Sequence, residues 1–186
     1  MKLENTEIDD LKLIYHDIHE DKRGYFMESF KENKLAEFGI NDRFVQDNLS
    51  RSCYGTIRGL HFQVSPFEQS KYIKSIYGSI IDTVVDLRPK SKTFLDIFQI
   101  ELNDINNLSL YIPSGFGHGF STISEEAIIY YKTSNYYSKD HDFGVNPYDE
   151  SLAIDWNLNK SNHIISDKDK NLPTINKLIE QGIIGK

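Results

Sequence analysis

The chain has 186 residues, of which 39% are hydrophobic and 12% aromatic, and its formal net charge at pH 7 is −7. A chain of this length fits one domain with a substantial core, and its many Tyr and Phe residues favour β structure. The acidic balance argues against a nucleic-acid binder, so an anionic ligand would have to be met by a local cluster of Arg and Lys.

A single cysteine, Cys53, excludes an internal disulfide framework and a zinc site of several cysteines, which is typical of a reducing compartment. The polar opening of the chain, M-K-L-E-N-T-E, predicts no signal peptide. No apolar run approaches the roughly 20 residues that a membrane-spanning helix needs. We therefore expect a soluble cytoplasmic protein, with residues 1–186 forming one domain and with neither nucleic acid nor a membrane as a partner.

The first forty residues predict two strands and a helix. An apolar strand runs from Leu11 to Tyr15, and a turn then leads into a strand that has Phe26, Glu28 and Phe30 on one face. A helix is predicted from Lys31 to Phe38, because Gly39 follows it as a stop signal.

Two polar strands follow. In R-F-V-Q-D-N-L-S, Gln46 and Asn48 share a face, which is either the polar edge of a sheet or a reader of a nucleobase, since an amide offers both a donor and an acceptor. In T-I-R-G-L-H-F-Q, regular alternation places Arg58 on one face and His61 on the other. His61 is by itself either a hydrogen-bonded strand residue or a functional group.

The next segments also predict strands, beginning at Lys71. In S-I-I-D-T-V-V-D-L-R, alternation places Asp82 and Asp86 together on one face, where buried carboxylates need partners such as Arg88 or a lysine. Three glycines and a proline around His118 predict a turn that holds this histidine in a fixed direction.

The last third of the chain adds a tyrosine-rich strand, in which Tyr131 and Lys132 face opposite ways, and a final helix from Ile175 to Gln181. About nine short strands, with helices only at the periphery, indicate an all-β sandwich or barrel.

Nine short motifs, in this order and spacing, resemble those of the dTDP-4-dehydrorhamnose 3,5-epimerases of the RmlC-like cupin family. They are R-G-Y-F-M-E, F-V-Q-D-N-L-S, R-G-L-H-F-Q, Q-S-K, V-D-L-R, I-P-S-G-F-G-H-G-F, Y-K-T-S-N-Y-Y, L-A-I-D-W and S-D-K-D-K-N-L-P. The resemblance implies a double-stranded β-helix, or jelly roll, with a few short peripheral helices. It also implies a homodimer, no metal and no cofactor.

The implied reaction inverts C3 and C5 of dTDP-4-dehydro-6-deoxy-D-glucose to give dTDP-4-dehydro-L-rhamnose. The C4 ketone makes the hydrogens on both carbons acidic, so the reaction needs a base, a group that stabilises the enolate, and an acid on the opposite face. By the resemblance, His61 is the base, and an unperturbed imidazole pKa of about 6.5 suits that task. Asp169 would orient the imidazole, Lys71 would stabilise the enolate oxygen, and Tyr131 would be the acid.

The resemblance also implies a set of substrate-binding residues. Arg23 and Arg58 would meet the diphosphate, because a guanidinium fork suits phosphate oxygens. Phe26 would stack near the base, and Glu28, Gln46 and Asn48 would complete the nucleotide end. The remaining positions around the sugar and the phosphates are His118, Tyr137, Asp142 and Lys168.

Three alternatives stay open at this point. A C3-only epimerase, or one that uses a different nucleotide sugar, would need the same base and acid. A metal-dependent cupin oxygenase is disfavoured because Gln63 stands where a second histidine ligand would be expected. A sugar-nucleotide-binding protein without catalysis is disfavoured because it would have no reason to keep base, acid and enolate-stabilising cation together.

Overall fold

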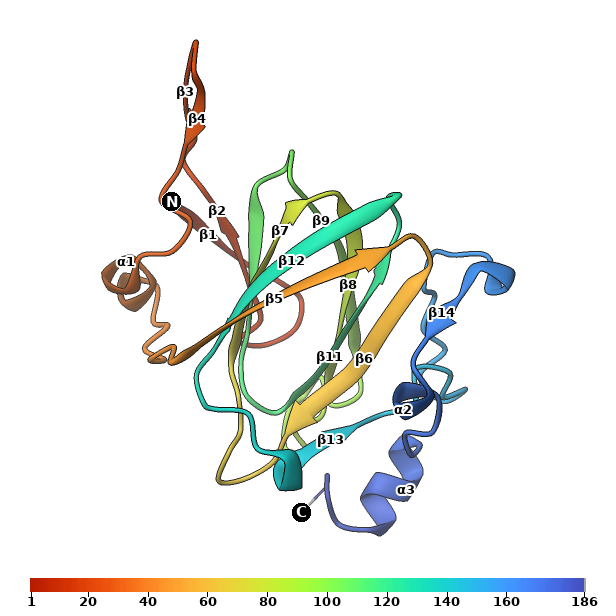
Figure 1. Cartoon of the computed structure of the whole chain (residues 1–186). Coiled ribbons are helices and arrows are strands. Elements are labelled where there is room, and N and C mark those ends of the chain that lie inside the picture. The colour runs from red at the N-terminus through yellow and green to blue at the C-terminus, as the bar shows by residue number, and fades with distance from the viewer. Residues whose placement is uncertain (186) are drawn as a thin grey trace.

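A computed structural model describes residues 1–185 of the chain, which form fourteen strands and a few short helices (Figure 1). The first sheet has the strand order β1 (Lys2–Asn5), β2 (Lys12–Tyr15), β10 (Leu108–Ile112), β7 (Lys71–Tyr77), β12 (Glu126–Thr133) and β5 (Gln46–Cys53). The second has the order β13 (Asp142–Gly144), β6 (Thr56–Gln63), β11 (Phe116–Thr122), β8 (Ser79–Asp86) and β9 (Ile97–Asn103), and β14 (Ile164–Ile165) pairs with β6.

The remaining strands, β3 (His19–Asp21) and β4 (Gly24–Phe26), form a hairpin that extends away from the two sheets (Figure 1). The helices are α1 (Glu32–Glu37), α2 (Asp167–Lys170) and α3 (Ile175–Glu180), with single 3₁₀ turns at Lys139–His141 and Lys160–Asn162. The all-β jelly roll and both predicted helices are therefore confirmed, the helices with slightly shorter bounds. No helix within residues 1–185 is long and apolar enough to cross a membrane.

Three clusters of buried side chains hold the sheets and their covers together. The main cluster fills the space between the sheets and includes Ile73 of β7 and Val84 of β8. A second cluster packs the carboxyl-terminal segment, with Trp156, onto the outer side of the second sheet. A third packs α1 onto the outer side of the first sheet. Because both sheets are covered on both sides over much of their area, strands such as β8 are nearly continuously buried, and their polar residues are buried with the apolar ones.

The side chains of β6 depart from regular alternation. Between His118 and Phe120 of β11 there is one intervening residue, whereas between their partners on β6, His61 and Arg58, there are two. The extra residue is a β-bulge, at which the alternation of the strand is shifted by one. Arg58 and His61 therefore both line one pocket, and the prediction that they lie on opposite faces was wrong.

The glycine-rich segment around His118 is a strand, β11, and the predicted turn was wrong. A Cβ on Gly119 would lie 2.5 Å from the carbonyl oxygen of Arg58, and a Cβ on Gly117 would lie 3.2 Å from Leu87 Cδ1. These glycines therefore allow the adjacent strand β6 and the Leu87 side chain to approach β11 closely, which is a second role of glycine besides turn formation.

The strand predicted to carry Phe26, Glu28 and Phe30 ends at Phe26. Phe30 instead turns onto the outer side of the first sheet, where its ring packs edge-on against Tyr72 at a centroid distance of 5.5 Å. Burial of the Phe30 ring in the third cluster overrides the local alternation.

Candidate active site

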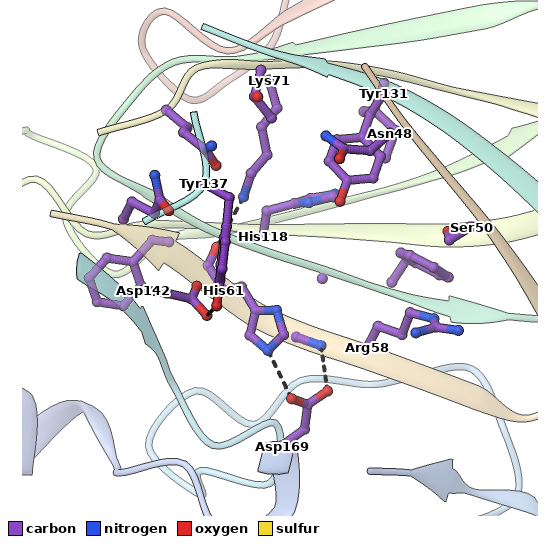
Figure 2. A pocket seen from close by; sticks show the side chains of 18 of the residues that line it. Asn48, Ser50, Arg58, His61, Lys71, His118, Tyr131, Tyr137, Asp142 and Asp169 are labelled. Atoms are coloured by element: carbon purple, nitrogen blue, oxygen red, sulfur yellow. Dashed lines mark hydrogen bonds and ion pairs between the residues drawn. The ribbon is translucent and has the colours of Figure 1, made fainter. Parts of the chain in front are cut away.

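A pocket of about 440 Å³ lies between the two sheets, and Figure 2 shows the side chains that line it. The first sheet contributes residues of β5, β7 and β12, the second contributes residues of β6, β11 and β13, and α2 closes one side. Eleven of the fourteen predicted site residues line this pocket: Gln46, Asn48, Arg58, His61, Lys71, His118, Tyr131, Tyr137, Asp142, Lys168 and Asp169.

His61 and Asp169 form a hydrogen-bonded pair, although they are 108 residues apart in the chain. The distance from His61 Nε2 to Asp169 Oδ1 is 2.8 Å, and the Gly59 N–H donates to Oδ2 at 3.3 Å (Figure 2). Burial alone would raise the pKa of the Asp169 carboxyl, but the hydrogen bonds from His61 and Gly59 outweigh it, so the pKa is lowered. Since an ionised carboxylate can only accept, Nε2 carries the proton and Nδ1 is the basic nitrogen.

The position of Asp169 is set by local helix capping. The Ser166 Oγ accepts a hydrogen bond from the Asp169 N–H at 3.0 Å, which fixes the first turn of α2. Asp169 is only 4% exposed, whereas the His61 side chain is 34% exposed and faces the pocket. The carboxylate thus orients the ring from behind and leaves its other edge free to meet a ligand.

Lys71 approaches from the opposite sheet and is 8% exposed. Its ammonium donates to the carbonyl oxygen of His61 at 3.1 Å. Burial lowers the pKa of Lys71 to about 8, while the charges of Asp82 and Asp142 work in the opposite direction. The pocket therefore contains a cation with little hydration, which interacts strongly with any negative charge that develops nearby.

Tyr131 lies on β12 of the first sheet, so it and His61 of the second sheet line the pocket from opposite walls (Figure 2). Burial raises the pKa of the Tyr131 phenol, Arg58 partly opposes this shift, and Asp142 adds to it. The phenol is therefore fully protonated at neutral pH and can act as a proton donor.

The other predicted residues of the pocket form two hydrogen-bonded groups around this centre. On β5, Gln46 donates to Asn48 Oδ1 at 2.9 Å and accepts the Tyr137 N–H at 3.0 Å, which places Tyr137 at the pocket. On the α2 side, Lys168 donates to Asp142 at 2.7 Å, and the Tyr137 hydroxyl donates to the same carboxylate at 3.3 Å. The hydrogen bond from Lys168 to Asp142, together with the attraction between their charges, raises the pKa of Lys168.

Three predicted binding residues, Arg23, Phe26 and Glu28, do not line the pocket. The Arg23 side chain is 84% exposed and pairs with Asp21 of the same hairpin. Phe26 is 67% exposed, and Glu28 pairs with Lys31 at 2.7 Å. Within one chain, the β3–β4 hairpin and the residues that follow it therefore hold these side chains outside the site.

Several pocket residues were not predicted from the sequence. Asp82 does not line the pocket, but its carboxylate oxygens lie 3.1 and 2.9 Å from Nε2 of His118, which does. Strand alternation had indicated that Asp82 needs a partner, but the predicted candidates were Arg88 or a lysine. Arg88 bonds instead to Asp86, so that its Nη2 lies 2.8 Å from Oδ2.

Gln63 and Ser50 are also pocket residues that the sequence did not reveal. The Gln63 amide donates to the carbonyl oxygens of Phe67 and Tyr136 and accepts the Ser138 N–H at 2.7 Å, so it joins two loops at the pocket mouth. The Ser50 hydroxyl is buried and has no hydrogen-bond partner within residues 1–185, although it lies on the same face of β5 as Asn48. Alternation along β5 could have identified Ser50.

In the part of the chain that the structure describes, no three His, Cys, Asp or Glu side chains gather as a metal site would require. His61 and His118, the two histidines that a metal-binding reading would use, are each hydrogen-bonded to a carboxylate. Their positions match an acid–base site better than a ligand set.

Comparison with known proteins identifies the family. The family model described as dTDP-4-dehydrorhamnose 3,5-epimerase matches residues 5–177. A dTDP-4-dehydrorhamnose 3,5-epimerase of Shigella flexneri is 41% identical over 172 residues, which cover 92% of this chain and 94% of the relative. A dTDP-4-dehydrorhamnose 3-epimerase of Streptomyces niveus is 38% identical over 157 residues, which cover 84% of this chain and 76% of the relative.

Among solved structures, the chain is similar to a dTDP-6-deoxy-D-glucose-3,5-epimerase of Legionella pneumophila in complex with dTDP-4-keto-L-rhamnose. The two are 40% identical with a TM-score of 0.93, and the match covers 100% of this chain and 97% of the other. Sequence and structure thus agree along nearly the whole chain, which therefore belongs to the dTDP-4-dehydrorhamnose 3,5-epimerase family.

Proposed function

We propose that this pocket inverts C3 and C5 of dTDP-4-dehydro-6-deoxy-D-glucose, giving dTDP-4-dehydro-L-rhamnose, and that His61, Lys71, Tyr131 and Asp169 carry the chemistry. The observation that supports this most directly is that His61 and Tyr131 line one pocket from opposite sheets. Inversion at carbon requires removal of a proton on one face of the ring and its return on the other.

In the first half of each inversion, His61 Nδ1 takes the proton from the carbon next to the C4 ketone. The electron pair of that C–H bond forms the new double bond, and the carbonyl electrons move to the C4 oxygen. The Lys71 ammonium would stabilise this enolate oxygen, and its burial makes the interaction stronger than it would be in water. Asp169 stabilises the imidazolium that forms.

In the second half, the Tyr131 hydroxyl gives a proton to the same carbon from the opposite face, and the carbonyl group is restored. Histidine has then gained a proton and tyrosine has lost one, so both must exchange with solvent before the next inversion. Burial raises the pKa of Tyr131, which makes a tyrosinate costly and favours its rapid reprotonation.

We further propose that Arg58 meets the diphosphate, that Gln46 and Asn48 bind the nucleotide, and that His118, Tyr137, Asp142 and Lys168 contact the sugar and the phosphates. Arg58 lies three residues from His61 on the same pocket wall, and its Nε is fixed by the Ser52 hydroxyl at 3.1 Å. A diphosphate bound there would place the attached sugar close to the base.

The decisive experiment is proton NMR of dTDP-4-dehydro-6-deoxy-D-glucose incubated with the protein in deuterated water. Deuterium at both C3 and C5 is expected for the 3,5-epimerase. Deuterium at C3 alone would favour the second candidate, a 3-epimerase, which the likeness to the Streptomyces niveus enzyme also supports. Absence of exchange at both carbons would contradict the proposal.

Two variants test the roles of the acid and the base. His61→Ala should abolish exchange while dTDP still binds, because the base does not hold the diphosphate. Tyr131→Phe should allow proton loss but slow reprotonation from the far face. Full epimerase activity of Tyr131→Phe would show that another group is the acid.

We propose that the protein acts as a homodimer in which Arg23, Phe26 and Glu28 of one copy reach the pocket of the other. The β3–β4 hairpin extends from the body, and its Tyr25 and Phe26 are 56% and 67% exposed, as expected for a segment that packs against another chain (Figure 1). In this arrangement each nucleotide site combines side chains from two copies.

Mixing two inactive or weakened variants tests this arrangement. In a mixed dimer of His61→Ala and Arg23→Ala chains, one pocket has an intact His61 and receives an intact Arg23 from the other copy. Activity of the refolded mixture should therefore exceed the sum of the separate variants. No recovery, despite mixed dimers shown by mass spectrometry, would contradict the shared site.

We also propose that residues 1–186 act as one domain and that the protein works in the cytoplasm. The single cysteine and the nucleotide-sugar substrate support this location.

A further inference from the structure

Asp82 has few hydrogen-bond donors for a carboxylate that is completely buried. Its exposure is 0%, and within residues 1–185 its only hydrogen-bond donor is Nε2 of His118. Asp86, four residues along the same strand and also fully buried, has donors on Arg88 and Thr93. A buried carboxylate with a single donor is costly, so Asp82 depends on nearby positive charge.

Lys71 provides that charge. The charges that act on its ammonium are those of Asp82 on β8 and Asp142 on β13, and the pocket that it lines also holds the titratable side chains of His61, His118 and Tyr131. Two of these are carboxylates, and they differ in what else they bind. Asp142 forms an ion pair with Lys168 and accepts a hydrogen bond from the Tyr137 hydroxyl, whereas Asp82 bonds to no lysine or arginine in the described residues.

We propose that Asp82 is a positioning residue whose buried carboxylate keeps the Lys71 ammonium charged and fixes the proton of His118 on Nε2. The inference rests on the proposed role of Lys71 at the enolate oxygen, since a neutral amine would lose most of that stabilisation. Asp82 does not line the pocket and acts only through the two neighbouring side chains.

Burial alone pulls the pKa of Lys71 down toward the range in which an enzyme at neutral pH would lose the charge. The opposing attraction of Asp82 comes from a carboxylate that is completely buried and does not line the pocket, so a ligand cannot displace it. Asp142, which lines the pocket, is less suited to this task, because Lys168 already binds its carboxylate at 2.7 Å.

The same carboxylate determines which nitrogen of His118 faces a ligand. A carboxylate only accepts, so His118 carries a proton on Nε2 whether its ring is neutral or charged. Nδ1 is then the nitrogen left for the substrate. His61 is oriented in the same way by Asp169, so the two histidines that pair across β6 and β11 are each fixed by their own carboxylate.

The first test follows the protonation of Lys71 without substrate. In protein labelled with ¹³C-lysine, the Cε signal of Lys71, assigned with Lys71→Met, should titrate near pH 8 in the wild type. In Asp82→Asn, which keeps the shape but removes the charge, the midpoint should fall by about 1 pH unit or more. The matched control, Asp86→Asn, removes a buried carboxylate from the same strand and should leave the midpoint in place. An unchanged midpoint in Asp82→Asn overturns the inference.

The second test uses the pH dependence of kcat/KM. A fall of the midpoint by about 1 unit predicts a loss of about twofold at pH 7 but nearly tenfold at pH 9, because the charged fraction of Lys71 falls most steeply above its pKa. A loss of equal size at both pH values would indicate a structural effect and would overturn the role in charge.

If Asp82→Asn does not fold, the wild-type protein still provides a test. Imidazole ¹⁵N spectra should show His118 with a proton on Nε2 throughout the titration, and a proton on Nδ1 alone would overturn the inference. The lysine and histidine titrations need no turnover, so they remain valid even if the deuterium experiment fails. Failure of the proposed function and failure of this inference are therefore distinguished.

Discussion

Replacing Lys71 by Met should stabilise the folded protein while it removes activity. Burial lowers the pKa of Lys71 from 10.5 to about 8, net of its attraction to Asp82 and Asp142. At about 1.4 kcal/mol per pKa unit, the charged lysine weakens the fold by about 3 kcal/mol at pH 7. Loss of the hydrogen bond to the His61 carbonyl offsets about 1 kcal/mol of this. A net gain of about 2 kcal/mol corresponds to a rise in Tm of about 4 to 8 °C for a chain of this size.

The assay is thermal unfolding of both proteins as a function of pH. The folded state binds its lysine proton less tightly than the unfolded state, so the wild type gains stability as pH rises from about 8 to 10.5. The advantage of Lys71→Met should be full below pH 8 and should shrink over that window. Lys168→Met, at an exposed lysine paired with Asp142, is the control and should not stabilise. A Tm of Lys71→Met equal to or below that of the wild type at pH 7 would refute the reasoning.

Three further outcomes are expected. Asp169→Asn should lower kcat by about 10²- to 10⁴-fold with dTDP affinity retained, because His61 loses its orienting carboxylate. The control Asp167→Asn, on the same helix, should have no effect. Full activity of Asp169→Asn would exclude the pair of His61 and Asp169 from catalysis. Gly119→Ala should lower the free energy of unfolding, measured with urea, by more than about 2 kcal/mol, since its Cβ would meet backbone atoms of β6. Gly117→Ala should lower it by less than about 1 kcal/mol, because its nearest neighbour is the movable side chain of Leu87. Equal losses in the two variants would contradict the argument that β6 approaches Gly119 closely. Gln63→Ala should raise KM several-fold in steady-state kinetics with little change in kcat, because the substitution releases the two loops that Gln63 joins. An unaltered KM would show that these loops hold their positions without Gln63.

The residues that the sequence placed correctly are those whose position follows from local pattern. Alternation put Asp82 and Asp86 together on β8, and the stop at Gly39 ended α1 near the expected point. The remaining features were decided by contacts between residues that are far apart in the sequence. Whether a glycine-rich stretch forms a turn or a strand depends on which neighbouring strand or side chain must approach it, and the sequence of the segment does not contain that information.

The candidate site shows the same division. Pairing of His61 with Asp169 came only from the resemblance, because nothing in the sequence brings residues 108 apart into contact. The sequence indicated that Asp82 needs a partner but did not identify His118 as its hydrogen-bond donor, since the two meet only through the register of β11 beside β8. The three residues of the β3–β4 segment could not be located at all, because their place depends on a second copy of the chain in our proposal.

The bulge in β6 sets a limit on how this protein can be redesigned. A strand with regular alternation would send either Arg58 or His61 into the apolar cluster behind the sheet, where Leu60 now lies. In the proposed site, diphosphate binding by Arg58 and proton removal by His61 therefore both depend on the one extra residue of this bulge. Substitutions along the pocket wall can change which sugar is accepted, but a one-residue insertion or deletion between Arg58 and His61 would separate recognition from reaction, however well each side chain were chosen.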